Sequence, residues 1–182
     1  MTTTVFKHTV IAIIAIFSTA FSFAQVNFTT MDYSIPKNQA ELITLGNDFF
    51  HSLVSGDFEK VSSLMTDDFQ VFGNGPQPLD KQTFIDVWKG YHKDGTSHGI
   101  SEGQIFAVNI KEGPLAGPVI LMWGAASWTP NGADKPIVSW VHNVMQVKDG
   151  KIGLIYHHQD QLSILMQMGF TVVPPSDQSG GK

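Results

Sequence analysis

Hydrophobic and polar positions alternate most clearly in two runs near the end of the chain, residues 137–147 and 152–158. Between them lies the turn Lys148-Asp149-Gly150-Lys151. Asp-Gly between two alternating runs predicts a β-hairpin, because a type I′ turn needs positive φ at both central residues. The two runs are therefore predicted to pair as neighbouring antiparallel strands.

The turn also predicts which residues of the hairpin face each other. If Asp149 and Gly150 form the loop, counting back places His142 opposite His157 and Asn143 opposite Tyr156. Side chains alternate between the two faces of a strand, so the polar residues divide into two groups. One face is predicted to carry Ser139, Asn143, Tyr156 and His158, and the other Trp140, His142 and His157.

Three segments before the hairpin have hydrophobic residues at helical spacing. The first begins near Ile35-Pro36 and ends at Gly56, the second follows Asp57, and the third begins at Asp80. Proline suits a first helical turn, aspartate caps a helix start, and glycine ends a helix. Three helices are therefore predicted before most of the sheet.

Short strand-like runs complete the pattern. Residues 69–72, 103–111 and 119–129 are predicted strands in addition to the hairpin, and turns rich in Gly, Pro, Asn and Asp favour an antiparallel meander over βαβ units. A short helix over residues 160–168 is predicted to follow. The order indicates an α+β fold in which a curved antiparallel sheet wraps around three N-terminal helices and leaves a pocket between them.

The ends of the chain predict export. Residues 1–24 contain a short basic start, an apolar run and a small-residue site, as in a secretory signal peptide, and the apolar run is short for a membrane anchor. Residues 25–34 are expected to be flexible, 35–170 to form one domain, and 171–182 to be disordered. The mature protein is therefore expected in the periplasm or outside the cell, without membrane attachment.

Composition excludes several kinds of chemistry. Of the 11 lysines, Lys7 would leave with the signal peptide, so 10 remain against 16 acidic residues, a formal charge of −6. This charge disfavours nucleic acid as a partner. The chain has no arginine, which removes the usual bidentate clamp for anions, and no cysteine, which removes disulfides and thiolate ligands.

Four segments between about residues 38 and 170 form a pattern: Gly56-Asp57-Phe58, Thr66-Asp67-Asp68-Phe69, the turn from Val144 to Ile152, and the run from Asp160 to Gly169. Together they resemble the SnoaL-like polyketide cyclase group of the nuclear transport factor 2-like superfamily. The resemblance implies a cone-shaped, cystatin-like fold that works without a cofactor and holds a small, mostly apolar molecule in an internal pocket. The same fold hosts isomerases, cyclases, dehydratases, epoxide hydrolases and members without known chemistry, so it does not determine the activity.

The resemblance also implies roles for particular positions. The acid/base aspartate of the cyclases matches Asp160 here. The oxyanion-hole positions of the ketosteroid isomerases match Phe49 and Asn143, and their general base falls near Gly73, which makes that chemistry doubtful. The epoxide hydrolases need an Asp-Arg-Asp arrangement, which a chain without arginine cannot supply.

Taken with the hairpin register, the resemblance places the face of Asn143 against the cavity. Asp160 and His158 are the predicted catalytic residues, since a histidine and a carboxylate in an apolar pocket can exchange a proton with a bound carbonyl compound. Asp160 as a helix cap alone and His158 as a pocket wall stay open as alternatives. Binding without chemistry and acid/base catalysis therefore both remain open as functions. The predicted ligand-binding residues are Asn143, Tyr156, Ser139, Trp88, Tyr91, Phe49, Leu53 and Trp123.

The opposite face of the sheet is expected to contact a second copy. Proteins of this fold commonly dimerise through that face, and an aromatic residue beside two histidines suits an interface. Its predicted residues are Trp140, His142 and His157. A metal site is not predicted, because the adjacent residues His157 and His158 point to opposite faces.

Overall fold

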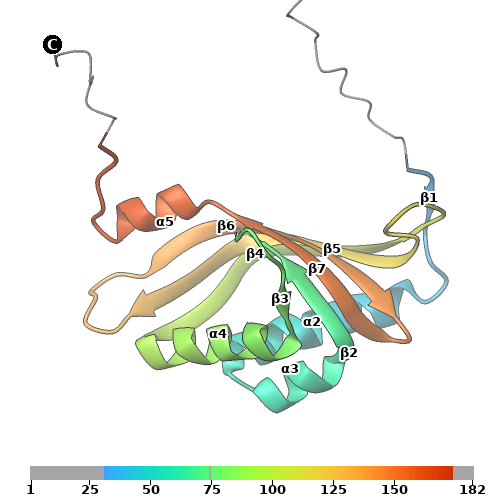
Figure 1. Cartoon of the computed structure of the whole chain (residues 1–182), viewed down its shortest axis with the longest axis horizontal. Coiled ribbons are helices and arrows are strands. Elements are labelled where there is room, and N and C mark those ends of the chain that lie inside the picture. Colours follow the sequence, from blue (N-terminus) through green and yellow to red (C-terminus); the bar gives the residue numbers. More distant parts are fainter. Residues whose placement is uncertain (1–30, 74, 174–182) are drawn as a thin grey trace, which may run out of the picture. The chain divides into compact units, whose positions relative to one another are not determined.

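The computed structural model describes residues 31–73 and 75–173 (Figure 1). The predicted signal peptide and most of the predicted disordered tail lie outside the described residues. Within them, no helix is long and apolar enough to cross a membrane. The elements in chain order are β1 (Tyr33–Ser34), α2 (Gln39–Ser55), α3 (Phe58–Leu64), β2 (Met65–Phe72), β3 (Leu79–Asp80), α4 (Lys81–Asp94), β4 (Gly95–Ile110), β5 (Gly117–Pro130), β6 (Ile137–Lys148), β7 (Lys151–Gln159) and α5 (Gln161–Gln167).

The strands form one sheet in the order β1-β4-β5-β6-β7-β2-β3. Strands β4 to β7 are the predicted antiparallel meander, and β2 joins β7 in parallel. The sheet curves over α2, α3 and α4, which lie on its concave side (Figure 1). The α+β fold class predicted from the sequence is therefore confirmed.

Side-chain caps explain where the helices begin and end. Asp57 accepts a hydrogen bond from the Lys60 N–H at 3.0 Å, and Asp80 accepts one from the Thr83 N–H at 2.8 Å. At the end of α2, Gly56 adopts the left-handed conformation with φ of 78°, which costs glycine little. These local interactions explain the starts of α3 and α4 and the end of α2. Helix α2 itself begins at Gln39, later than the start predicted near Ile35-Pro36, and has no side-chain cap there.

Helix α2 supplies the centre of the core. Its stripe of Leu42, Phe49 and Leu53 is between 1% and 4% exposed. The helix approaches the sheet closely at Gly46, where an added Cβ would lie 2.5 Å from Ile105 Cδ1 and 3.1 Å from Ile120 Cγ2. A side chain at this position would require the end of the Ile105 side chain to move.

The hairpin of β6 and β7 departs from the predicted register. The pairs Lys148↔Lys151 and Val147↔Ile152 are as predicted, but the register then shifts, so that Gln146 pairs with Leu154 and leaves Gly153 as an extra residue. Such a β-bulge exchanges the two faces of the strand beyond it. The observed pairs beyond the bulge are Met145↔Ile155, Val144↔Tyr156, Asn143↔His157 and His142↔His158.

The bulge decides which apolar residues of β7 face the core. Ile152 is 0% exposed and Ile155 is 2% exposed, so both face the core. A strand without the bulge would place Ile155 on the outer face and Leu154 on the inner face in its place. The pairing of β7 with β2 shifts at the same level. The predicted pairing of Asn143 with Tyr156 is therefore wrong, and His157 takes the inward position.

Candidate functional site

The inner face of the sheet carries a small polar group surrounded by apolar residues. Asn143 on β6 is only 5% exposed, and its Oδ1 lies 2.9 Å from Nδ1 of His157 on β7. Ser139, four residues before Asn143 and on the same face, is 4% exposed. Buried polar groups normally have hydrogen-bond partners, so this cluster is the part of the core that packing alone does not explain.

The hydrogen bonds of Asn143 determine the tautomer of His157. Nδ2 of Asn143 donates to the Met122 sulfur at 3.7 Å, so Oδ1 is the atom that faces the imidazole. Because Oδ1 can only accept, Nδ1 of His157 must carry the hydrogen. In the neutral ring the lone pair is then on Nε2. Asn143 thus helps to fix the orientation of the His157 ring.

His157 stays neutral at lower pH than an ordinary histidine. Burial lowers the pKa of its ring below 6.5, a contact with the Gln159 side chain raises it, and the charge of His158 lowers it further. The first effect is the largest. A neutral imidazole near pH 7 can accept a proton, whereas an imidazolium cannot.

Gly73, directly after β2, lies beside the His157 ring. A Cβ added at Gly73 would be 3.9 Å from Cδ2 of that ring. The resemblance to ketosteroid isomerases places their general base near this glycine, which has no side chain to act. The neighbouring strand β7 carries the His157 imidazole beside this glycine.

An aromatic row runs along α4 to β5. Ring centroids are 6.3 Å apart for Phe84 and Trp88, 6.0 Å for Trp88 and Tyr91, and 6.0 Å for Tyr91 and Trp128. Trp88 and Trp128 are partly buried, and Tyr91 is 43% exposed. The core is therefore closed around α2 and opens toward the C-terminal half of α4.

Several predicted site residues lie away from the inner face of the sheet. Asp160 is exposed and caps α5 by accepting a hydrogen bond from the Ser163 N–H at 2.9 Å. The bulge places His158 and Tyr156 on the outer face, where both are exposed. Trp123 is opposite His142 on that same face, with ring centroids 6.3 Å apart. The predicted positions of these residues at the cavity are therefore wrong.

Phe49 and Leu53 are inward-facing, as predicted, but they belong to the closed core rather than to its open end. They are 1% and 2% exposed and pack in the main hydrophobic cluster. Of the predicted ligand-binding residues, Asn143 and Ser139 are buried together on β6, and Trp88 and Tyr91 are neighbours on α4. Sequence reasoning assigned His157 to the outer face and so missed the inner histidine.

The outer face of the sheet carries an aromatic patch, hereafter the outer patch. Trp140 is 55% exposed, and Tyr156 stacks near Phe72 with ring centroids 5.3 Å apart. His142 is on this face as predicted, and His158 replaces His157 beside it. The outer patch comprises Phe72, Phe106, Trp123, Trp140, His142, Tyr156 and His158.

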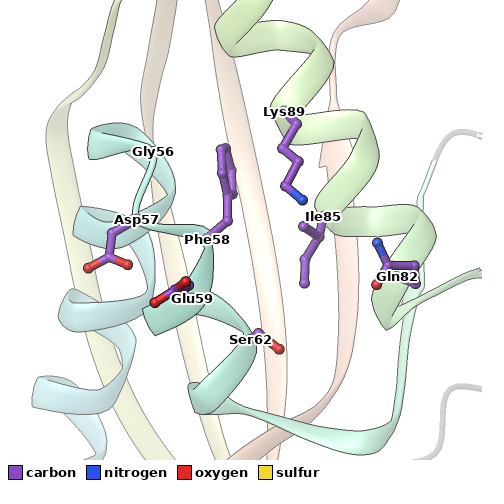
Figure 2. A pocket seen from close by; sticks show the side chains of 8 residues that line it. All are labelled: Gly56, Asp57, Phe58, Glu59, Ser62, Gln82, Ile85 and Lys89. Carbon is purple, nitrogen blue, oxygen red and sulfur yellow. The ribbon is translucent and has the colours of Figure 1, made fainter.

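A pocket of about 740 Å³ between α3 and α4 was not predicted (Figure 2). Phe58 and Ile85 supply its apolar part, and Glu59, Gln82 and Lys89 its polar part (Figure 2). None of the predicted site residues lines it. Among the described residues, no group of three or more His, Asp or Glu side chains could hold a metal ion.

Solved structures share the fold at low sequence identity. No protein-family model matches the chain, and no curated protein matches it significantly. An LEH-like epoxide hydrolase from M. tuberculosis aligns at 18% identity and a TM-score of 0.56, over 71% of this chain and 90% of the other. A candidate SnoaL-like polyketide cyclase from Shewanella putrefaciens aligns at 13% identity and 0.55, over 76% and 100%.

A third structure, a protein of ketosteroid isomerase-like fold from Catenulispora acidiphila, aligns at 9% identity and a TM-score of 0.54, over 78% of this chain and 100% of the other. At such identities the similarity concerns the fold. The resemblance to SnoaL-like proteins of the nuclear transport factor 2-like superfamily is confirmed at that level.

Proposed function

We propose that this protein binds a small, mostly apolar, uncharged molecule against the inner face of the sheet, with an oxygen atom of the ligand at Asn143. The observation that carries this proposal is the hydrogen bonding of the buried Asn143 side chain. Its Nδ2 group, in a residue only 5% exposed, donates to a thioether sulfur at 3.7 Å. A thioether is a weak acceptor, so a ligand carbonyl or hydroxyl oxygen would be a better partner.

Two further features support a ligand at this wall. The Ser139 hydroxyl has only a long contact, 3.4 Å, with the Trp140 carbonyl oxygen, so its donor is also available. The aromatic row at Trp88 and Tyr91 is only partly covered and offers apolar surface next to solvent. An apolar site with few polar groups is the usual form of a small-molecule pocket.

The charges near the site favour an uncharged ligand. Asn143, Ser139 and Gln159 are uncharged, and His157 is neutral near pH 7 because burial lowers its pKa. An anion would lack a lysine or arginine partner there, and burying an unpaired ion is costly. Arginine, which the epoxide hydrolases of this fold require, is absent from the sequence.

A pair of matched probes tests this proposal. 2-Tetralone and its hydrocarbon analogue tetralin differ by one carbonyl oxygen, and tryptophan fluorescence of the protein reports binding. We expect 2-tetralone to bind about 2- to 12-fold more tightly, the equivalent of one hydrogen bond of about 0.5–1.5 kcal/mol. The substitution Asn143→Leu should abolish this preference, whereas Asp160→Asn, which retains a capping side chain, should leave it unchanged. Absence of binding, or the same preference in Asn143→Leu, would contradict the proposal.

We also propose that two copies pair through the outer patch. Trp140 at 55% exposure and Tyr156 at 42% form part of an aromatic surface that solvent covers poorly. The substitution Trp140→Glu should then convert a dimer into a monomer in analytical ultracentrifugation, and a monomeric wild-type protein would refute the pairing.

Export remains a prediction from residues 1–24, and an N-terminus at Gln25 in the secreted protein would support it.

A further inference from the structure

We propose that the pocket between α3 and α4 binds a short apolar peptide whose two ends are free, with the ammonium group on the α3 wall and the carboxylate group at Lys89 on the α4 wall. This site is separate from the inner face of the sheet, and none of the residues that carry the proposed function lines it. The inference is therefore independent of the proposed function.

The pocket is formed by one side of each helix. On α4, Gln82, Ile85 and Lys89 recur at spacings of three and four residues, which places their side chains on the same side of the helix. On α3, Phe58 and Ser62 are four residues apart and share a side in the same way. Figure 2 shows Phe58, Ile85 and Lys89 directed into the space between the two helices. The volume of about 740 Å³ is in the range of sites that hold drug-sized molecules, which suits a short peptide.

The apolar part of the pocket is held in place by packing. Ile85 is 6% exposed and belongs to the main hydrophobic cluster, and the partly buried Phe58 packs against that cluster. The Phe58 ring meets the His92 ring edge-on with centroids 5.3 Å apart, and Nε2 of His92 lies 2.8 Å from the Leu53 carbonyl oxygen. Because a carbonyl oxygen only accepts, His92 donates this hydrogen bond. A preformed apolar surface lowers the entropic cost of binding an apolar side chain.

The α3 wall carries the acidic groups of the pocket. Asp57 and Glu59 line it, and within the described part of the chain neither carboxylate forms an ion pair. One oxygen of Asp57 accepts the Lys60 N–H at 3.0 Å, which leaves its second oxygen and Glu59 as acceptors. Two carboxylates beside an apolar surface suit an ammonium group.

The α4 wall carries the opposite charge. The ammonium nitrogen of Lys89 lies 3.9 Å from Oδ1 of Asp86, beyond hydrogen-bond distance. Both oxygens of Asp86 already accept hydrogen bonds from Gln82, at 3.0 and 3.1 Å. Lys89 therefore retains donors for a carboxylate of a ligand. An ion of a single charge would be repelled by one of the two walls, whereas a zwitterion is attracted by both.

Three related ligands test the inference in isothermal titration calorimetry. Leucyl-leucine carries both charges, N-acetyl-leucyl-leucine lacks the ammonium group, and leucyl-leucine amide lacks the carboxylate group. We expect leucyl-leucine to bind about 2- to 5-fold more tightly than either blocked form, which is the effect of one solvent-accessible ion pair. Sodium chloride at about 1 M should remove most of this difference, because salt screens exposed charges.

Substitutions on each wall assign the two charges of the ligand. The double variant Asp57→Asn, Glu59→Gln, which keeps a capping side chain, should remove the advantage of leucyl-leucine over its acetylated form. Lys89→Gln should remove the advantage over the amide. All three side chains are exposed, so these variants should fold. Glu41→Gln on α2 and Lys93→Gln near the end of α4 change exposed charges outside the pocket and are the matched controls.

The outcomes separate this site from that of the proposed function. Binding of 2-tetralone should be the same in all these variants, and leucyl-leucine should not compete with it. If leucyl-leucine does not bind, if the blocked forms bind equally well, or if the wall variants keep the preference, this inference is refuted and the proposed function is unaffected. Free leucine binding as tightly as the dipeptide would overturn the assignment to peptides. If leucyl-leucine behaves as expected and 2-tetralone does not bind, only the proposed function fails.

Discussion

Truncation of Phe49 should destabilise the fold strongly, because the structure places this side chain in the closed core. The ring is 1% exposed. It meets Phe50 edge-on with centroids 5.4 Å apart and stacks on Phe84 at 6.2 Å. Replacing a buried phenylalanine by alanine typically costs about 3–5 kcal/mol, including the cavity that remains. Phe49→Ala should therefore lose a large part of the about 5–15 kcal/mol that stabilises a typical domain.

Urea denaturation monitored by circular dichroism measures this loss. With a slope of about 2 kcal/mol per molar urea, a loss of about 4 kcal/mol lowers the midpoint by about 2 M. Tyr91→Ala is the matched aromatic truncation at the open end of the core, where the ring is 43% exposed. Its cost should stay near the value of its aromatic contacts, about 1 kcal/mol. A midpoint change below about 0.5 M for Phe49→Ala at an unchanged slope would refute the assignment of Phe49 to the closed core.

Three further predictions test the register, the protonation of His157 and the cap of α5. The chain has no cysteine, so Tyr156→Cys, His157→Cys and His158→Cys each introduce one thiol. The thiols at positions 156 and 158 should react with Ellman's reagent about tenfold or more faster than the thiol at position 157. The reverse order of reaction rates would favour the register without a bulge. Because burial lowers the pKa of His157 below 6.5, the unfolded chain binds more protons between the two values, so the free energy of unfolding should fall as pH decreases through 6.5. Its slope, at most about 1.4 kcal/mol per pH unit for this histidine, should diminish in His157→Gln when measured by denaturation at pH 5 to 8, and an identical slope would contradict the assignment. Asp160→Ala should lower protection of α5 amides in hydrogen exchange by the equivalent of about 1 kcal/mol, whereas Asp160→Asn should not, and equal protection in both variants would contradict the capping role.

Local chemistry in the sequence was sufficient to predict most of the elements. Asp57, Asp80 and Asp160 cap helices in the structure, and Gly56 ends α2 in the left-handed conformation. The Asp149-Gly150 turn also formed as predicted, with φ of 52° and 73°. Each of these features depends on a few neighbouring residues, so the sequence contains the whole cause.

The faces of the strands depended on contacts that the sequence does not display. Gly153 is a local signal for a bulge, since glycine inside a strand often marks one. Whether the strand uses the bulge depends on the burial of Ile155 and on the parallel pairing of β7 with β2, a strand about eighty residues earlier. Trp123 posed the same difficulty, because the run from Val119 to Trp123 is apolar at every position and does not reveal its face.

By itself, then, the sequence determined the α+β order, the helix caps and the hairpin turn, and the family resemblance implied the inward position of Asn143. Only the tertiary structure decided that His157, and not His158, is the histidine beside it. The physical reason is that alternation gives relative orientation within a strand, whereas one extra residue at Gly153 exchanges the two faces. In the assembled core the exchanged face buries Ile155 among residues that are distant in the chain.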